Sequence, residues 1–162
     1  MIVSYILIEP FSPSEQFIKA FEETIKARSA IGIKSFYTKR VAQNTGFGSE
    51  VQLLGNTYSA NYNSDLKTDV EVFSQTLKPC YRLVIVGSEH DAVQLCAFAS
   101  GMGWEVAIVA HPKEEKQLKD FPGASSLQGV VAEQMDVSQI DQQTAIILMT
   151  HSYVKDLQFL IA

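Results

Sequence analysis

Histidines are the residues of this chain whose positions most favour chemistry. The 162-residue sequence contains three of them, His90, His111 and His151. Each follows a stretch that predicts a β-strand. In a doubly wound sheet of strand order 3-2-1-4 these strands are adjacent, and ligands bind in the crevice beyond their carboxyl ends. We therefore expect the three imidazoles to converge on one site, although each taken singly is more simply an exposed loop residue.

Imidazoles at such a site suit three kinds of chemistry: hydrogen bonding to an anion, acid–base catalysis and metal binding. A metal would also need Glu89 or Asp91, and we identify no further carboxylate that would orient the rings. Metal binding therefore stays an alternative with no ligand assigned. No catalytic residue is assigned either, because Ser152 lies too close to His151 for an ordinary triad and Cys96 is predicted inside a helix.

The turn after the first of these strands argues against a dinucleotide. Residues 87–90 read Gly-Ser-Glu-His, whereas the dinucleotide fingerprint needs a second glycine so that the backbone can approach the pyrophosphate. Glu89 stands at that position and would repel phosphate. Residues 109–111, at the end of the next strand, lack the acid that binds the ribose hydroxyls. NAD(P) is therefore not expected, but Ser88 and the following helix N-terminus suit another anion.

The elements that position these residues follow from the hydrophobic pattern after Tyr81. Leu83–Val86 is a continuous apolar run, as in a strand covered on both faces, and an amphipathic helix follows it. The alternation of strands and helices indicates a parallel sheet, so the predicted fold class is α/β, Rossmann-like over residues ~80–162. The predicted strands are 83–86, 104–109, 130–131 and 145–149, and the helices begin near 90 and span 113–119, 136–140 and 153–162.

Residues 1–78 read as a smaller α+β segment, so the predicted domains are 1–78 and 79–162. Ser12 is the expected N-cap of a helix, with Pro13 in its first position and Glu15 three residues after the cap. Asn and Gly clusters near residues 44–48 and 55–56 predict turns between short strands. The predicted strands are 2–8, 31–37, 51–54, 57–62 and 70–73.

Composition excludes two classes of partner. The chain has 13 basic and 18 acidic residues, a formal charge of −5, so it offers no general attraction for nucleic acid or an anionic membrane surface. We see no leader segment, and no apolar run approaches the roughly 20 residues of a membrane-spanning helix. The two cysteines, Cys80 and Cys96, have no metal-binding spacing. A cytoplasmic protein with reduced thiols is expected.

Four ordered segments of the second part resemble a known family. They are the run from Arg82 through Gly87-Ser88-Glu89-His90, then Gly103-Trp104-Glu105-Val106, then Phe121-Pro122-Gly123-Ala124, and Met149-Thr150-His151-Ser152 with the residues that follow. Together they resemble the Rossmann domain of the XdhC/CoxI family, over about residues 68–162. These are accessory proteins of xanthine dehydrogenase and related molybdenum hydroxylases.

The resemblance implies a binding or chaperone protein without turnover of its own. Such a protein binds the molybdenum cofactor, molybdopterin, protects it during sulfuration and delivers it to the apoenzyme of a molybdenum hydroxylase. Two alternatives stay open: an NAD(P)-binding oxidoreductase-like protein, and a ligand-free interaction module. The ligand-binding residues expected on this basis are Gly87, Ser88, Glu89, His90, His111, Thr150 and His151.

The sequence also differs from the family pattern. Residues 87–90 read G-S-E-H where the family usually has G-A-G-H, and residues 110–112 lack the family's usual acid and arginine. The family's N-terminal domain is not recognisable in residues 1–67. The chain stops before a further strand that family members carry, which leaves apolar surface beside its last helix. Either residues 1–78 or a second subunit must cover that surface, and we expect a homodimer.

Overall fold

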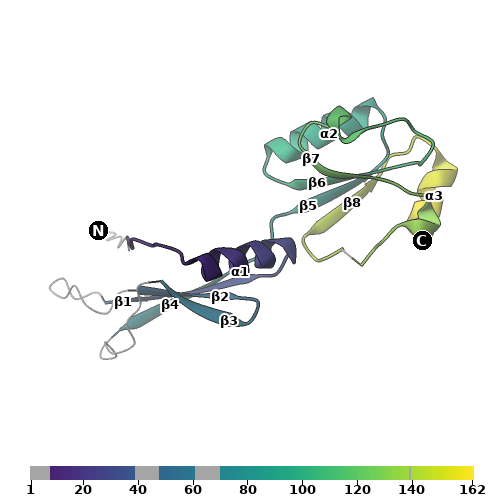
Figure 1. Cartoon of the computed structure of the whole chain (residues 1–162). Helices are drawn as coiled ribbons and strands as arrows, with labels where there is room; N and C mark the ends of the chain where they lie inside the picture. The colour runs from purple at the N-terminus through teal and green to yellow at the C-terminus, as the bar shows by residue number, and fades with distance from the viewer. Residues whose placement is uncertain (1–7, 39–47, 61–69, 139) are drawn as a thin grey trace, which may run out of the picture. The chain divides into compact units, whose positions relative to one another are not determined.

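The computed structural model describes residues 8–38, 48–60, 70–138 and 140–162. By its internal contacts the chain divides into two units, Met1–Pro79 and Cys80–Ala162, each with its own sheet (Figure 1). The predicted strand 2–8 and the predicted turn at 44–48 fall largely or wholly outside the described residues. Within the described residues, no helix combines the length and apolar character needed to cross a membrane.

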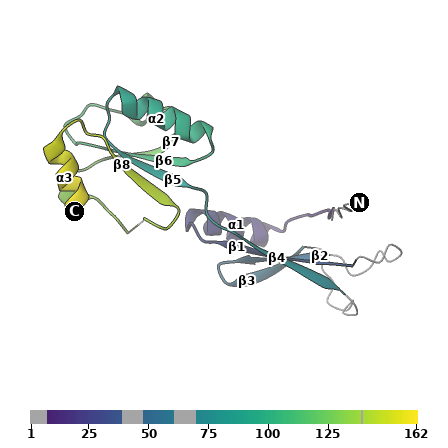
Figure 2. The same ribbon diagram turned by 180° about the vertical axis from the view of Figure 1, so that it is seen from behind.

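In its described residues, the first unit is an antiparallel sheet with one helix. Its strand order is β3-β2-β1-β4, and α1 lies along one face of the sheet (Figure 2). Leu54 and Gly55 connect β2 to β3 and both have positive φ, at 47° and 83°, which is the geometry of a tight two-residue hairpin turn. The elements are α1 (Glu15–Lys26), β1 (Ile31–Tyr37), β2 (Gly48–Leu53), β3 (Asn56–Ala60) and β4 (Glu71–Leu77).

The N-cap of helix α1 lies two residues later than predicted. Ser14, not Ser12, accepts the backbone N–H of Phe17 at 3.2 Å, so Pro13 lies outside the helix. The ring of Phe17 meets Tyr58 of β3 edge-on, with centroids 5.6 Å apart. This contact attaches the apolar side of α1 to the sheet.

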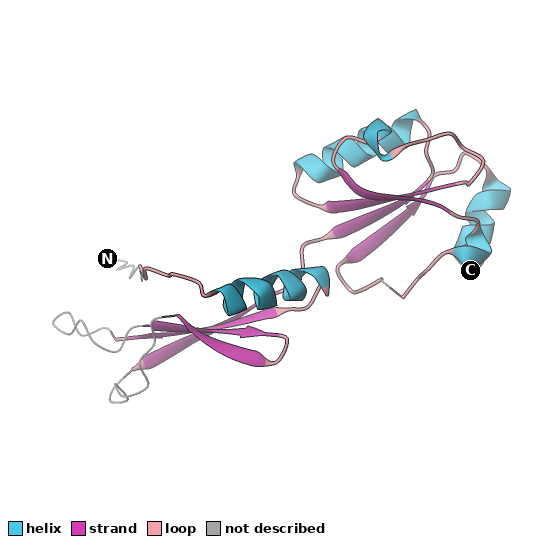
Figure 3. Cartoon of the chain, in the orientation of Figure 1, coloured by secondary structure: helices cyan, strands magenta, loops and turns pink. Residues whose placement is uncertain are grey.

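The second unit is the predicted parallel sheet. The order β7-β6-β5-β8 is the 3-2-1-4 order expected from the sequence, and all three strand pairs are parallel (Figure 3). The α/β, Rossmann-like fold class is confirmed. Its elements are β5 (Arg82–Val86), α2 (His90–Gly101), β6 (Glu105–Ala110), η1 (Leu118–Asp120), β7 (Ala124–Gly129), η2 (Ala132–Gln134), β8 (Thr144–Leu148) and α3 (Tyr153–Ile161).

Two apolar clusters cover the faces of this sheet. On one face, Leu83 and Ile85 pack with Cys96 of α2 and with Phe121. On the other face, Val84 and Val86 pack with partly buried neighbours that include Phe159 of α3. Because residues 83–86 of β5 are buried from both sides, their side chains are all apolar, which explains why this strand is visible in the sequence.

Three predicted elements of this unit are wrong. The third strand is Ala124–Gly129 and not 130–131. The sequence does not show this edge strand because it is polar and has no apolar run. One of its polar side chains, Ser125, donates its hydroxyl to the Val106 carbonyl at 2.9 Å. No helix forms over 113–119, which has too few apolar side chains to bury, and only the 3₁₀ turn η1 touches its end. The described residues of 136–140 also form no helix, since the Asp136 carboxylate accepts the Ser138 N–H at 2.9 Å in a local turn.

Candidate functional site

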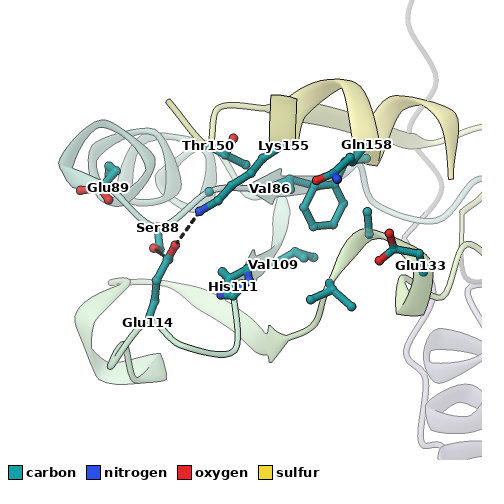
Figure 4. Close-up of a pocket in the computed structure, with 14 residues that line it drawn as sticks. Val86, Ser88, Glu89, Val109, His111, Glu114, Glu133, Thr150, Lys155 and Gln158 are labelled. Carbon is teal, nitrogen blue, oxygen red and sulfur yellow. Dashed lines mark hydrogen bonds and ion pairs between the residues drawn. The ribbon is translucent and has the colours of Figure 1, made fainter. Parts of the chain in front are cut away.

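A pocket of about 220 Å³ lies beyond the carboxyl ends of β5, β6 and β8 (Figure 4). The turn after β5, the loop after β6, the 3₁₀ turn η2 and the start of α3 all contribute to its wall. This is the crevice in which sheets of this topology bind ligands. The lining residues are Val86, Gly87, Ser88, Glu89, Val109, His111, Glu114, Val131, Ala132, Glu133, Thr150, Lys155, Gln158 and Phe159.

The turn after β5 brings backbone and hydroxyl groups to the pocket. Gly87 has φ of +142°, and a side-chain carbon there would lie 2.8 Å from the carbonyl carbon of Met149 and still closer to its oxygen. Its N–H donates to the Val109 carbonyl at 2.9 Å, and the Met149 N–H donates to Val86 at 2.8 Å. The turn therefore fits tightly between β6 and β8, and it requires glycine.

Ser88 is the most enclosed polar group of this pocket, with 2% of its surface exposed. Its hydroxyl donates to one carboxylate oxygen of Glu114, and the other oxygen of that carboxylate lies 3.9 Å from the Lys155 ammonium. Figure 4 shows the Glu114 carboxylate between these two groups. Residues from three separate segments thus meet at one carboxylate.

Glu114 and Lys155 were not among the residues predicted from the sequence. Lys155 follows the helix cap Ser152 by three residues, so its place in the first turn of α3 could have been read from the sequence. Glu114 lies in the loop after β6, where a helix was predicted. No sequence signal marks its contact with Ser88, because that contact depends on the path of the loop.

Thr150 is held at the pocket wall by α3. Its backbone N–H and its hydroxyl both donate to the Asp156 carboxylate, at 3.0 and 2.6 Å. The hydroxyl bond first and the backbone bond second lower the pKa of Asp156, because both stabilise the ionised carboxylate. These two hydrogen bonds fix the loop between β8 and α3, and with it the start of the helix that carries Lys155.

The three histidines do not meet in this pocket. Of the three, His111 lines it, and its Nδ1 accepts the Lys113 N–H at 3.2 Å. His90 lies outside the lining and contacts Gln94 of its own helix, Nε2 to Nε2, at 3.0 Å. His151 has φ of +56°, and its ring pairs with the exposed Asp91 carboxylate at 2.8 Å.

The contact between His151 and Asp91 also affects the ionisation of the carboxyl group. The hydrogen bond from the His151 ring is the main cause that lowers the pKa of the Asp91 carboxyl. His151 therefore links the loop after β8 to the first turn of α2 at the surface. Within the described residues, no group of three or more His, Cys, Asp or Glu side chains could hold a metal ion.

Comparison with known protein families places the second unit in a family. The model of the XdhC Rossmann domain matches residues 83–162. This part of the chain belongs to the XdhC family. A crystal structure described as a xanthine dehydrogenase from Bacillus halodurans is similar over 91% of this chain and 46% of its own, with a TM-score of 0.68 and 16% identity. The chain therefore spans about half of that structure, and the likeness shows the fold. No curated protein sequence matches the chain.

The two ends of the pocket in this XdhC Rossmann domain carry different polar groups. Ser88 and Lys155 supply donors near the turn after β5, while Glu133 on η2 lies away from them in Figure 4. Of the seven residues predicted to bind ligand, Gly87, Ser88, Glu89, His111 and Thr150 line the pocket, and His90 and His151 do not. Such a wall can bind an anionic group at one end and hydrogen-bond donors of a ligand at the other.

Proposed function

We propose that the chain is an accessory protein of a molybdenum hydroxylase such as xanthine dehydrogenase, and that its XdhC Rossmann domain binds the molybdenum cofactor or a related phosphorylated pterin. The observation that carries the proposal is the pocket of this domain, in which Ser88 and Lys155 lie at one end and Glu133 lies away from them. The redox chemistry belongs to the cofactor once it is in the target enzyme, and the present chain binds and orients it.

The donor set fits the phosphate of such a ligand. Lys155 supplies a point charge, Ser88 a buried hydroxyl, and α2 and α3 begin close to the same place. Backbone N–H groups at helix N-termini favour anions. A phosphate lying between the turn after β5 and the first turn of α3 would therefore meet donors from two sides.

The opposite end of the pocket fits the pterin ring. An aminopyrimidinone edge presents N–H donors, which a carboxylate accepts well. Glu133 lines the pocket on η2 with Val131 and Ala132 beside it. We therefore place the ring toward η2 and the phosphate toward Ser88.

A dinucleotide fits less well. Glu89 lines the pocket at the position where the dinucleotide fingerprint has glycine, and no side-chain bond ties its carboxylate to the helix it precedes. Its charge would face the pyrophosphate. Titration calorimetry with NAD and NADP should give no heat.

Retention of the cofactor tests the proposal. Purified protein mixed with molybdenum cofactor should keep pterin fluorescence through gel filtration, and Lys155→Gln should lose most of it. Lys116→Gln is the matched control, because Lys116 is exposed and does not line the pocket. The cofactor proposal fails if wild-type protein retains no pterin, or if both variants retain it equally.

The partner, assembly and location are proposed on the same basis. We propose that the apoenzyme of a molybdenum hydroxylase binds this chain, that the chain forms a homodimer, and that both act in the cytoplasm. The thiols of Cys80 and Cys96 suit a reducing compartment. Co-purification of a hydroxylase subunit with tagged protein would support the partner, and its absence from cells that express both would count against it.

A further inference from the structure

The Glu114 carboxylate lies where the anionic end of a ligand would bind. One of its oxygens accepts the hydrogen bond from the Ser88 hydroxyl, and the other faces the Lys155 ammonium. Lys155 is the one Lys or Arg among the described residues that line the pocket. An incoming anion would therefore need the same two donors that Glu114 already uses.

The size of the pocket agrees with this reading. The cavity measures about 220 Å³, below the roughly 300–1,000 Å³ of typical small-molecule sites. Glu114 contributes to the wall that limits it. Removal of this side chain from the pocket would enlarge the cavity at the end that carries Ser88 and Lys155.

Glu114 can leave without disturbing the sheet. It lies in the loop between β6 and η1, and 31% of its side chain is exposed. The Glu114 N–H donates to the His111 carbonyl at 2.9 Å, so the backbone stays in a turn while the side chain changes rotamer. Displacement therefore costs the Ser88 bond and the weak Lys155 pair, and no strand contact.

We propose that Glu114 is a built-in competitor that restricts this site to ligands with a phosphate monoester. The inference rests on the proposed function for the identity of the pterin, but not for the phosphate. A tethered group competes at an effective concentration in about the millimolar range. A simple carboxylate, with the same charge as Glu114, gains too little to displace it. A phosphate dianion brings more charge and more acceptor oxygens to Lys155 and Ser88.

The experiment follows backbone amide signals of the ¹⁵N-labelled full chain during titration with inorganic phosphate. Glu114→Gln keeps the size and the acceptor for Ser88 but removes the charge. We expect it to bind phosphate on the order of tenfold more tightly than wild type, the effect of a lost charged hydrogen bond at a partly exposed site. Glu114→Ala should do the same.

Two control variants separate competition from a general charge effect. Glu133→Gln removes a carboxylate from the same pocket without freeing Ser88 or Lys155, and should change phosphate affinity less than threefold, as expected for a screened charge. Glu115→Gln, exposed and outside the pocket, should match wild type. Lys155→Gln added to Glu114→Gln should abolish the gain.

The outcomes distinguish the two proposals. If Glu114→Gln binds phosphate more tightly than wild type while no variant retains pterin, the competitor is confirmed and the cofactor proposal is wrong. If the cofactor binds wild type and Glu114→Gln equally, the cofactor proposal holds and the competitor is wrong. Equal gains in Glu114→Gln and Glu133→Gln, or no phosphate binding by either Glu114 variant, would also overturn the competitor.

Discussion

Substitution of Gly87 by alanine tests the turn on which the pocket depends. Two effects add at this position. Backbone at φ of +142° is sparsely populated for any other residue and costs about 1–3 kcal/mol. The new methyl group would also press on the Met149 carbonyl, with the carbonyl carbon at 2.8 Å, and such overpacking costs about 1–3 kcal/mol. We expect a loss of roughly 4 kcal/mol, a large part of the stability of a small domain.

Two other glycines of the same unit provide matched controls. Gly103 also has positive φ, +86°, but nothing lies within 4 Å of an added methyl group. Gly103→Ala should therefore show strain alone, about 1–2 kcal/mol. Gly101 ends α2 with neither strain nor contact, and Gly101→Ala should be neutral or stabilising by up to about 0.5–1 kcal/mol.

Denaturant unfolding followed by tryptophan fluorescence measures all three variants. Trp104, the one tryptophan of the sequence, stacks on Tyr81 with ring centroids 5.3 Å apart, so its signal reports on the second unit. The order of stability should be Gly101→Ala, wild type, Gly103→Ala and then Gly87→Ala. If Gly87→Ala and Gly103→Ala lose the same free energy of unfolding, the contact between the turn and Met149 does not require glycine at position 87, and the reasoning fails.

Four further predictions concern other parts of the chain. Asp156→Asn should destabilise the second unit at neutral pH. Because the folded pKa of Asp156 is below its ordinary 3.8, this stabilisation is present above pH 4 and is lost as pH falls through the folded pKa, so wild type and variant should converge in acid unfolding curves. Leu54→Asn should stabilise the first unit by about 1 kcal/mol in thermal unfolding followed by circular dichroism, since asparagine tolerates positive φ in a hairpin turn. A thiol reagent should label the exposed Cys80 at once but Cys96 after unfolding, because burial encloses Cys96 and raises its pKa. Light scattering after size-exclusion chromatography should show a dimer at micromolar concentration, because the apolar side chains of α3 are exposed.

Each of these has a clear contrary result. A constant difference between Asp156→Asn and wild type from pH 7 to pH 2 would contradict the pKa argument. A lower melting temperature for Leu54→Asn would show that the leucine contributes packing that outweighs its strain. Equal labelling rates for the two cysteines would mean that the core around Cys96 opens readily. A monomer at micromolar concentration would refute the dimer.

The sheet could be predicted from the sequence because its central strands are buried on both faces. Burial requires apolar side chains along β5, and the resulting run of residues 83–86 is visible without a structure. Edge strand β7 has no such requirement, so its polar residues gave no signal. The segments that connect the later strands also carried no sequence signal. A short crossover can be made from turns whose geometry depends on local side-chain hydrogen bonds, such as the one that Asp136 accepts.

Five of the residues that line the pocket were predicted from the sequence, but neither Glu114 nor Lys155 was. Strand order together with the family resemblance placed residues 87–90, 111 and 150–151 at one edge of the sheet. It did not give the direction of each side chain: His151 has left-handed backbone geometry and pairs with Asp91, away from the pocket lining. Side-chain direction depends on tertiary partners that a single sequence does not reveal.

Net charge likewise describes the whole chain but not the local site. A net charge of −5 argues against extended anionic partners, whose binding depends on many neutralised phosphates. It does not argue against one small anion, because charges farther away than about 8–10 Å are screened at physiological ionic strength. In our proposal, the local arrangement of Lys155, Ser88 and two helix N-termini against Glu114 decides anion binding at this pocket. If Glu114 is the competitor we propose, phosphate affinity should change far more on loss of this one carboxylate than on loss of any exposed acid outside the pocket.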